Sequence, residues 1–122
     1  MDKLINEVLL KILHGDNKYL KRLMKQLSQF KIKTREMSGV GFFYEFEVPD
    51  ELSINEIGDM SFGDVIGEIE GVKNGVGFIL FIKDGKLDML EGYTYDEPWP
   101  PSIKSYTLNY MNDKRDLPEI LR

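Results

Sequence analysis

Apolar residues in the first quarter of the chain recur every three or four positions, which is the spacing of one face of an α-helix. The pattern covers residues 2–13 and again about 17–29. Asp2 can cap the first helix and Asp16 or Asn17 the second, because a short polar side chain accepts hydrogen bonds from unpaired backbone N–H groups. We predict two short helices joined by a tight turn, with one long kinked helix as the alternative.

From residue 31 onward, apolar and polar residues alternate, which is the period of a β-strand. Strands are predicted over 31–37, 42–48, 64–72, 76–83, 86–95 and 103–110. The Asn74-Gly75 and Asp84-Gly85 pairs predict tight hairpin turns, since both central residues of such a turn take positive φ. These turns join three strands into an antiparallel meander. Its middle strand is apolar on both faces, so we expect it to be covered on both sides.

The remaining segments are predicted to connect or follow the helices and strands, and not to form a further layer. Residues 50–63 form a long connection with a short helical turn, and residues 111–122 are charged and expected on the surface. No linker divides the chain, so 1–122 is expected to form a single domain. We predict an α+β fold, with one or two N-terminal helices packed on an antiparallel sheet of five or six strands.

Composition excludes several kinds of chemistry. The 122 residues include no Cys and one His, which removes disulfides, thiolate metal sites and a cysteine nucleophile. We assign no catalytic residue, no metal site and no cofactor. The apolar run near the N-terminus is far shorter than the about 20 residues that cross a membrane, and acidic residues interrupt the basic start that a signal peptide needs. We therefore expect a cytoplasmic protein without membrane contact.

Charge is divided unevenly along the chain. Residues 1–36 hold nine bases and four acids, whereas residues 37–122 hold seven bases and seventeen acids. Four bases form a stripe on the second predicted helix: Lys18, Lys21, Arg22 and Lys25. Contact with nucleic acid is one interpretation of this stripe, and the net charge of −5 argues against it. Contact with the acidic sheet, within the chain or in a homodimer, is the alternative.

The segment from Tyr93 to Pro101 combines aromatic, acidic and proline residues. Prolines stiffen such a loop, and rigid aromatic side chains lose little entropy when they bind a partner. The residues predicted to bind a partner, in this segment and in the predicted strand 64–72, are Glu68, Glu70, Tyr93, Tyr95, Asp96, Glu97 and Trp99. The aromatic residues can serve as anchors if they are exposed. Alternatively, Trp99 and Tyr95 pack against the sheet and pin the loop.

Carboxylates also raise the alternative of a hydrolytic site or a site for a hard metal. Glu68 and Glu70 share one face of a strand, and Asp88 and Glu91 are expected in a neighbouring strand. The alternative interpretation is the solvated face of an antiparallel sheet. His14 can act as a general base, or it can simply stabilise the end of the first helix.

Residues 75–100 read GVGFILFIKDGKLDMLEGYTYDEPWP. Over residues 64–100 the chain resembles a family of small bacterial proteins of uncharacterised function, in its double hairpin and its aromatic, acidic, proline-rich ending. In size, charge and architecture it is also similar to immunity proteins of bacterial toxin systems. This similarity implies a non-enzymatic interaction protein, in one form an inhibitor that binds a basic toxin. The alternatives are a small-molecule-binding or hydrolytic enzyme and a structural homodimer.

Overall fold

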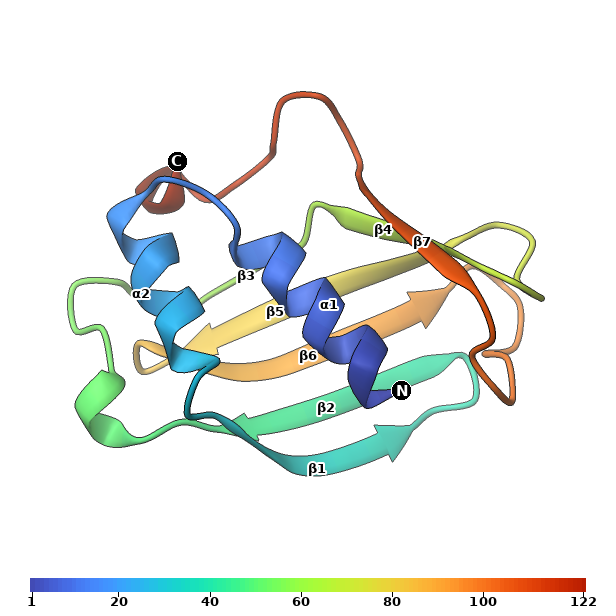
Figure 1. The fold of residues 1–122 in the computed structure, drawn as a ribbon, viewed down its shortest axis with the longest axis horizontal. Helices are drawn as coiled ribbons and strands as arrows, with labels where there is room; N and C mark the ends of the chain where they lie inside the picture. Colours follow the sequence, from blue (N-terminus) through green and yellow to red (C-terminus); the bar gives the residue numbers. More distant parts are fainter.

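The computed structural model describes residues 1–122 and places two helices on one side of a seven-stranded antiparallel sheet (Figure 1). This arrangement confirms the predicted α+β class, with one strand more than expected. The helices are α1 (Asp2–Leu13) and α2 (Lys18–Gln26). The strands are β1 (Lys31–Met37), β2 (Gly41–Glu47), β3 (Met60–Phe62), β4 (Val65–Ile69), β5 (Val76–Lys83), β6 (Lys86–Thr94) and β7 (Tyr106–Tyr110). Two short 3-10 turns complete the chain, η1 (Asp50–Leu52) and η2 (Glu119–Leu121).

The strands lie in the order β1-β2-β6-β5-β4-β7, so the predicted β4-β5-β6 meander is present. The unpredicted strand β3 pairs with the end of β5, where Phe62 lies opposite Leu80, while β4 pairs with its beginning. Gly63 joins β3 to β4 in close contact with the backbone of β5, because an added Cβ would lie 1.9 Å from the Phe78 carbonyl oxygen. A strand of three residues is too short to show an alternating pattern, which explains why the sequence did not reveal it.

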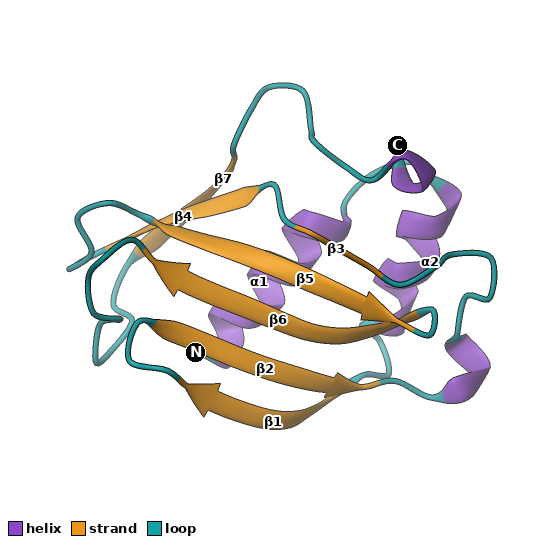
Figure 2. Ribbon diagram, turned by 180° about the vertical axis from the view of Figure 1, so that it is seen from behind, coloured by secondary structure: helices purple, strands orange, loops and turns teal.

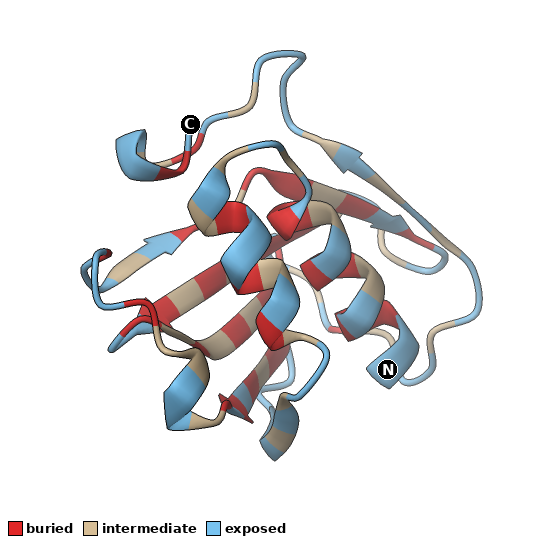
Figure 3. Ribbon diagram, turned by 60° about the vertical axis from the view of Figure 1, so that its left-hand side comes forward, coloured by how far each residue is buried: buried red, intermediate tan, exposed pale blue.

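The main core lies between the helices and the sheet, and the helix surfaces that face the sheet are buried (Figure 3). All six apolar residues of the predicted stripe on α1 are buried there. Alternate residues of β2, as predicted, and of β5 pack against them from the sheet: Phe42, Tyr44, Phe46, Val76, Phe78, Leu80 and Ile82. Burial of this apolar surface is the main force that fixes the two layers together.

The opposite face of the sheet has no element packed on it (Figure 2). Ile79 and Phe81 of β5 point to this side and are only half-buried. The expectation that β5 is covered on both faces is therefore wrong. Both helices come from the first 26 residues and cover the same face, and the rest of the chain supplies no further long helix.

The ends of the two helices differ in how they are capped. The Asn17 side chain accepts hydrogen bonds from the backbone N–H groups of Tyr19 (2.8 Å) and Leu20 (3.1 Å), so it caps α2 as predicted. Met1, not Asp2, occupies the capping position of α1, and no side chain caps that end. Asp2 lies in the first turn instead, where its carboxylate pairs with Arg35 of β1 at 2.8 Å.

Neither helix is long and apolar enough to cross a membrane.

The C-terminal segment packs against α2 and does not simply lie on the surface as expected. Leu121 is completely buried and Leu117 nearly so. The Asn17 amide nitrogen donates hydrogen bonds to the carbonyl oxygens of Ile120 (3.0 Å) and Arg122 (2.9 Å). Two isolated leucines among charged residues give no periodic signal, so the sequence could not reveal this contact.

Candidate functional site

The uncovered face of the sheet combines carboxylates with apolar side chains. Side chains alternate between the two faces of a strand, so the residues between the buried ones point away from the helices. This uncovered face includes Phe43 and Glu45 of β2, Ile79 and Phe81 of β5, Met89, Glu91 and Tyr93 of β6, and Ile66 and Glu68 of β4. Apart from Tyr93, the apolar and aromatic members were not among the predicted site residues. Ile79 and Phe81 were missed because the sequence suggested that β5 was covered on both sides.

An open groove of about 970 Å³ lies where β4 and β5 approach their connecting loop. Three predicted site residues line it together, namely Glu68, Glu70 and Tyr95. The Ser105 hydroxyl donates a hydrogen bond of 3.0 Å to the Glu70 carboxylate, and Lys73 brings one positive charge to the rim. The groove is therefore open and is lined by two carboxylates, one lysine and the exposed Tyr95.

Tyr93 and Tyr95 form an aromatic pair beside the groove, with ring centres 5.5 Å apart and planes at 77°. Tyr93 lies across Gly77, because a Cβ added at that glycine would lie 2.4 Å from the Tyr93 Cζ. Burial raises the pKa of Tyr93, and the neighbouring Tyr95 and Glu91 raise it further. Tyr95 is 45% exposed. The pair thus presents one fixed ring and one accessible ring, as a partner-binding role requires.

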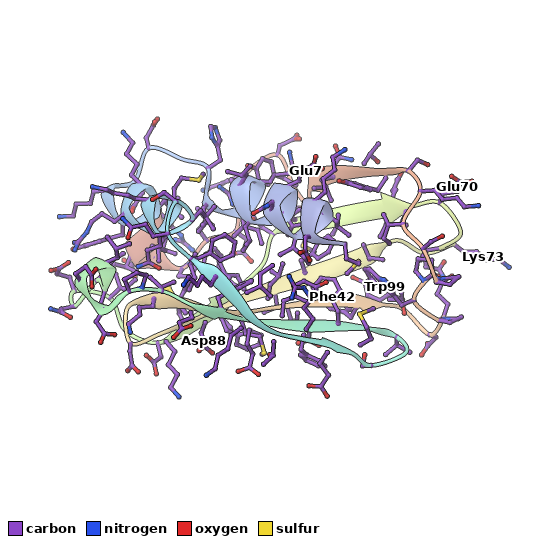
Figure 4. The ribbon with its side chains drawn as sticks, turned by 60° about the horizontal axis from the view of Figure 1, so that its bottom comes forward. Glu7, Phe42, Glu70, Lys73, Asp88 and Trp99 are labelled. Atoms are coloured by element: carbon purple, nitrogen blue, oxygen red, sulfur yellow. The ribbon has the colours of Figure 1, made fainter.

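Trp99 is buried, with 8% of its surface exposed, so it cannot act as an exposed anchor. Its ring contacts Phe42 edge-on at 5.3 Å, and the two side chains lie between the helices and the sheet (Figure 4). Its backbone N–H donates to the Gly39 carbonyl at 2.9 Å. Trp99 therefore pins the loop against the core, which is the alternative interpretation for this residue. Asp96, in the same loop, is exposed and takes a positive φ of 54°.

Glu97 holds the loop that joins β4 to β5. Its two carboxylate oxygens accept hydrogen bonds of 2.9 Å from the backbone N–H groups of Lys73 and Asn74. These bonds hold the pKa of Glu97 below its ordinary value. The loop is longer than the predicted two-residue turn, and of its central pair only Gly75 takes a positive φ. Glu97 is therefore a structural residue that shapes the wall of the groove.

Replacing Glu97 by glutamine is expected to destabilise the protein at neutral pH, because an amide has one acceptor oxygen for two N–H donors. The pKa of Glu97 is lowered in the folded state, so its contribution is present above the unfolded pKa and disappears as pH falls through the folded pKa. Urea unfolding of wild type and E97Q should therefore differ at pH 7 and converge in acid. The exposed neighbour provides the control, D96N, and equal loss in both variants at pH 7 would contradict this role.

The carboxylates proposed for hydrolysis do not come together as a facing pair. Strand β5 lies between β4 and β6, so Glu68 and Glu91 are not on neighbouring strands as predicted. Glu70 lies near one end of the sheet and Asp88 toward the other (Figure 4). The cause is the meander itself, because two successive hairpins place the second strand between the first and the third. Glu68 and Glu70 alone share the groove.

The basic stripe lies on the helix side of the molecule, away from the uncovered face. Lys18, Lys21 and Lys25 are exposed on α2, and Arg22 pairs with Glu56 at 2.5 Å. His14 is exposed just after α1, where its carbonyl oxygen accepts a hydrogen bond from Arg115. The outer surface of α2 is therefore basic, whereas the sheet carries both signs of charge, with Lys31 and Lys33 on its edge strand β1.

Comparison of the whole chain with known protein families, with curated proteins and with solved structures finds no match. The features from which a function can be inferred are the fold, the uncovered face and the groove.

Proposed function

We propose that this chain is a non-enzymatic interaction module that binds a basic protein partner through the uncovered face of its sheet and the adjoining groove. The observation that supports this most is the composition of that face. It has Glu45, Glu68 and Glu91 set among half-buried apolar side chains, with no covering element. Interfaces commonly combine an apolar centre with a polar rim, and complementary charge directs the approach of the partner.

A basic toxin fits this surface in one concrete form of the proposal. A toxin that cuts nucleic acid needs a positively charged cleft, and an acidic protein is steered toward such a cleft and can block it. The exposed carboxylates of the groove, Glu68 and Glu70, would supply charge, and Tyr95 would supply contact area. The role would be that of an immunity-type inhibitor in the cytoplasm of a bacterium.

The layered arrangement supports a different protein as partner over a second copy of this chain. The bases of α2 and the acids of the sheet lie on opposite sides of the molecule. A contact between the helices of one copy and the sheet of another would be head-to-tail, and each copy would keep one unused face for the next. Such a contact closes into a ring or extends into an open chain of molecules, and it does not form a two-fold dimer.

Capture of a partner from the native host tests the proposal. The tagged protein is compared with a variant in which Glu45, Glu68 and Glu91 are replaced by glutamine. We expect the wild type to retain a basic protein, and the face variant to bind it about tenfold or more weakly. The control carries the same charge change at exposed positions elsewhere, E51Q, D113N and E119Q, and should bind as the wild type does. Equal retention by the face variant, or a partner without a basic surface, would contradict the proposal.

A further inference from the structure

Glu91 occupies the centre of the uncovered face and is surrounded by apolar side chains. It lies directly opposite Phe43 on one neighbouring strand and Ile79 on the other. Met89 and Tyr93 flank it two positions away along β6, on the same face. Directly opposed side chains on neighbouring strands contact each other. The Glu91 carboxylate is therefore half-buried within a ring of four large side chains.

The charge of Glu91 is not balanced within the chain. It forms no ion pair and accepts no hydrogen bond from another residue. Its surroundings add further negative charge, since Glu45 lies opposite Met89 and Glu36 opposite Phe43. Arg35 of the edge strand is directed away, to Asp2 on the helix side. A partner that covers this face must therefore provide a cation, because burying an unpaired carboxylate is strongly unfavourable.

We propose that Glu91 is the receptor for an arginine side chain of the protein partner, with Phe43 and Tyr93 stacking against its guanidinium group. This inference rests on the proposed function and identifies the central contact of that interface. A guanidinium is flat, keeps its charge, stacks on aromatic rings and pairs with a carboxylate through two hydrogen bonds. A lysine ammonium is more strongly hydrated and gains less from the rings. An anionic ligand such as nucleic acid would be repelled by the carboxylates.

The four side chains around Glu91 are well arranged for binding, because one of them, Tyr93, is held in place. Tyr93 rests on Gly77, which leaves no room for a Cβ beneath the phenol ring. Tyr95 contacts the same ring edge-on, from outside the sheet. A fixed aromatic side chain loses little conformational freedom when a partner binds. The site is thus arranged before the arginine arrives.

Titration with two short peptides tests the assignment directly. The probes are acetyl-Gly-Arg-Gly-amide and its uncharged analogue with citrulline in place of arginine, observed through the methyl signals of Met89 and Ile79 by NMR. We expect saturable shifts of these methyl groups with the arginine peptide, and about tenfold weaker binding of the citrulline peptide. E91Q should reduce arginine binding to the citrulline level, whereas the remote control E51Q should bind as the wild type does.

A second variant keeps the test informative if E91Q does not fold. F43L retains the carboxylate and removes one ring. With acetyl-Gly-Lys-Gly-amide as a third probe, the wild type should prefer the arginine peptide and F43L should lose most of that preference. Equal binding of arginine and citrulline peptides, or shifts confined to the groove at Met111, would overturn the Glu91 assignment. Those results leave partner capture unaffected, whereas a captured partner without a basic surface overturns the proposed function but not the peptide site.

Discussion

Replacing Arg115 by methionine is expected to lower the free energy of unfolding by about 3–5 kcal/mol, which is typical when one partner of a buried ion pair is removed. The Asp64 side chain is almost completely buried, and Arg115 donates to both its oxygens at 2.7 and 2.8 Å. Without Arg115, the carboxylate remains in the core with no cation. Urea unfolding followed by circular dichroism at pH 7 measures the loss.

Arg115 also connects three parts of the chain that are distant in sequence. Its guanidinium donates to the carbonyl oxygens of Ile12 (2.7 Å) and His14 (2.5 Å) at the end of α1, and it stacks on the Tyr110 ring at 4.4 Å. These contacts predict that R115K, which keeps the charge without the forked geometry, is intermediate between wild type and R115M.

The exposed neighbour Lys114 provides the matched control for Arg115. K114M should change the free energy of unfolding by no more than about 0.5 kcal/mol, as surface substitutions usually do. A double variant, D64N with R115M, should recover part of the loss because the buried charge is removed together with its partner. If R115M costs no more than K114M, the ion pair does not hold the C-terminal segment.

The local signals in the sequence predicted the elements of the fold well. Helical spacing marked α1 and α2, and alternation marked β2, because both patterns depend on neighbours a few positions apart. The Asp84-Gly85 pair takes positive φ at both positions, as the predicted turn requires. Contacts between distant segments were not predictable, because no periodic pattern records which polar side chain reaches which backbone group.

The candidate site was predictable only in part, for the same reason. The spacing of Glu68 and Glu70 placed both on one face, and the structure brings them into one groove with Tyr95. The burial of Trp99 depends on Phe42, more than fifty positions away in the chain, so its sequence neighbours could not reveal it. The apolar centre around Glu91 depends on one face having no cover, which is a property of the complete fold.

The opposite characters of the two layers explain why binding and stability are expected to separate. The residues that hold the layers together are on the helix side of the sheet, whereas the proposed contact residues point away from it. Glutamine substitutions at Glu45, Glu68 or Glu91 should therefore alter partner binding without large losses of stability. For a side chain that joins the layers we expect the opposite, that is, a large loss of stability when it is replaced.

Gln26 is such a side chain, and Q26L is expected to lower the free energy of unfolding by about 3 kcal/mol. Gln26 is completely buried on α2, and its amide donates to the carbonyl oxygens of Leu52 (3.0 Å) and Gly85 (2.9 Å). Its side-chain oxygen accepts from the Leu87 N–H at 2.9 Å. Leucine makes none of these bonds, and each buried group left without a partner costs about 1–3 kcal/mol.

A charged substitute at the same position separates the loss of hydrogen bonds from a loss of packing. Q26E keeps the shape of the side chain, but its carboxylate would face two carbonyl oxygens in the core. Burial raises the pKa of such a group above its unfolded value, so its folded state is favoured at low pH and loses stability as pH rises. Q26E should therefore be less stable at pH 7 than at pH 4, relative to wild type. The exposed control Q29L should be close to wild type at both values. A Q26L variant as stable as Q29L would mean that the amide does not join α2 to the β5–β6 turn.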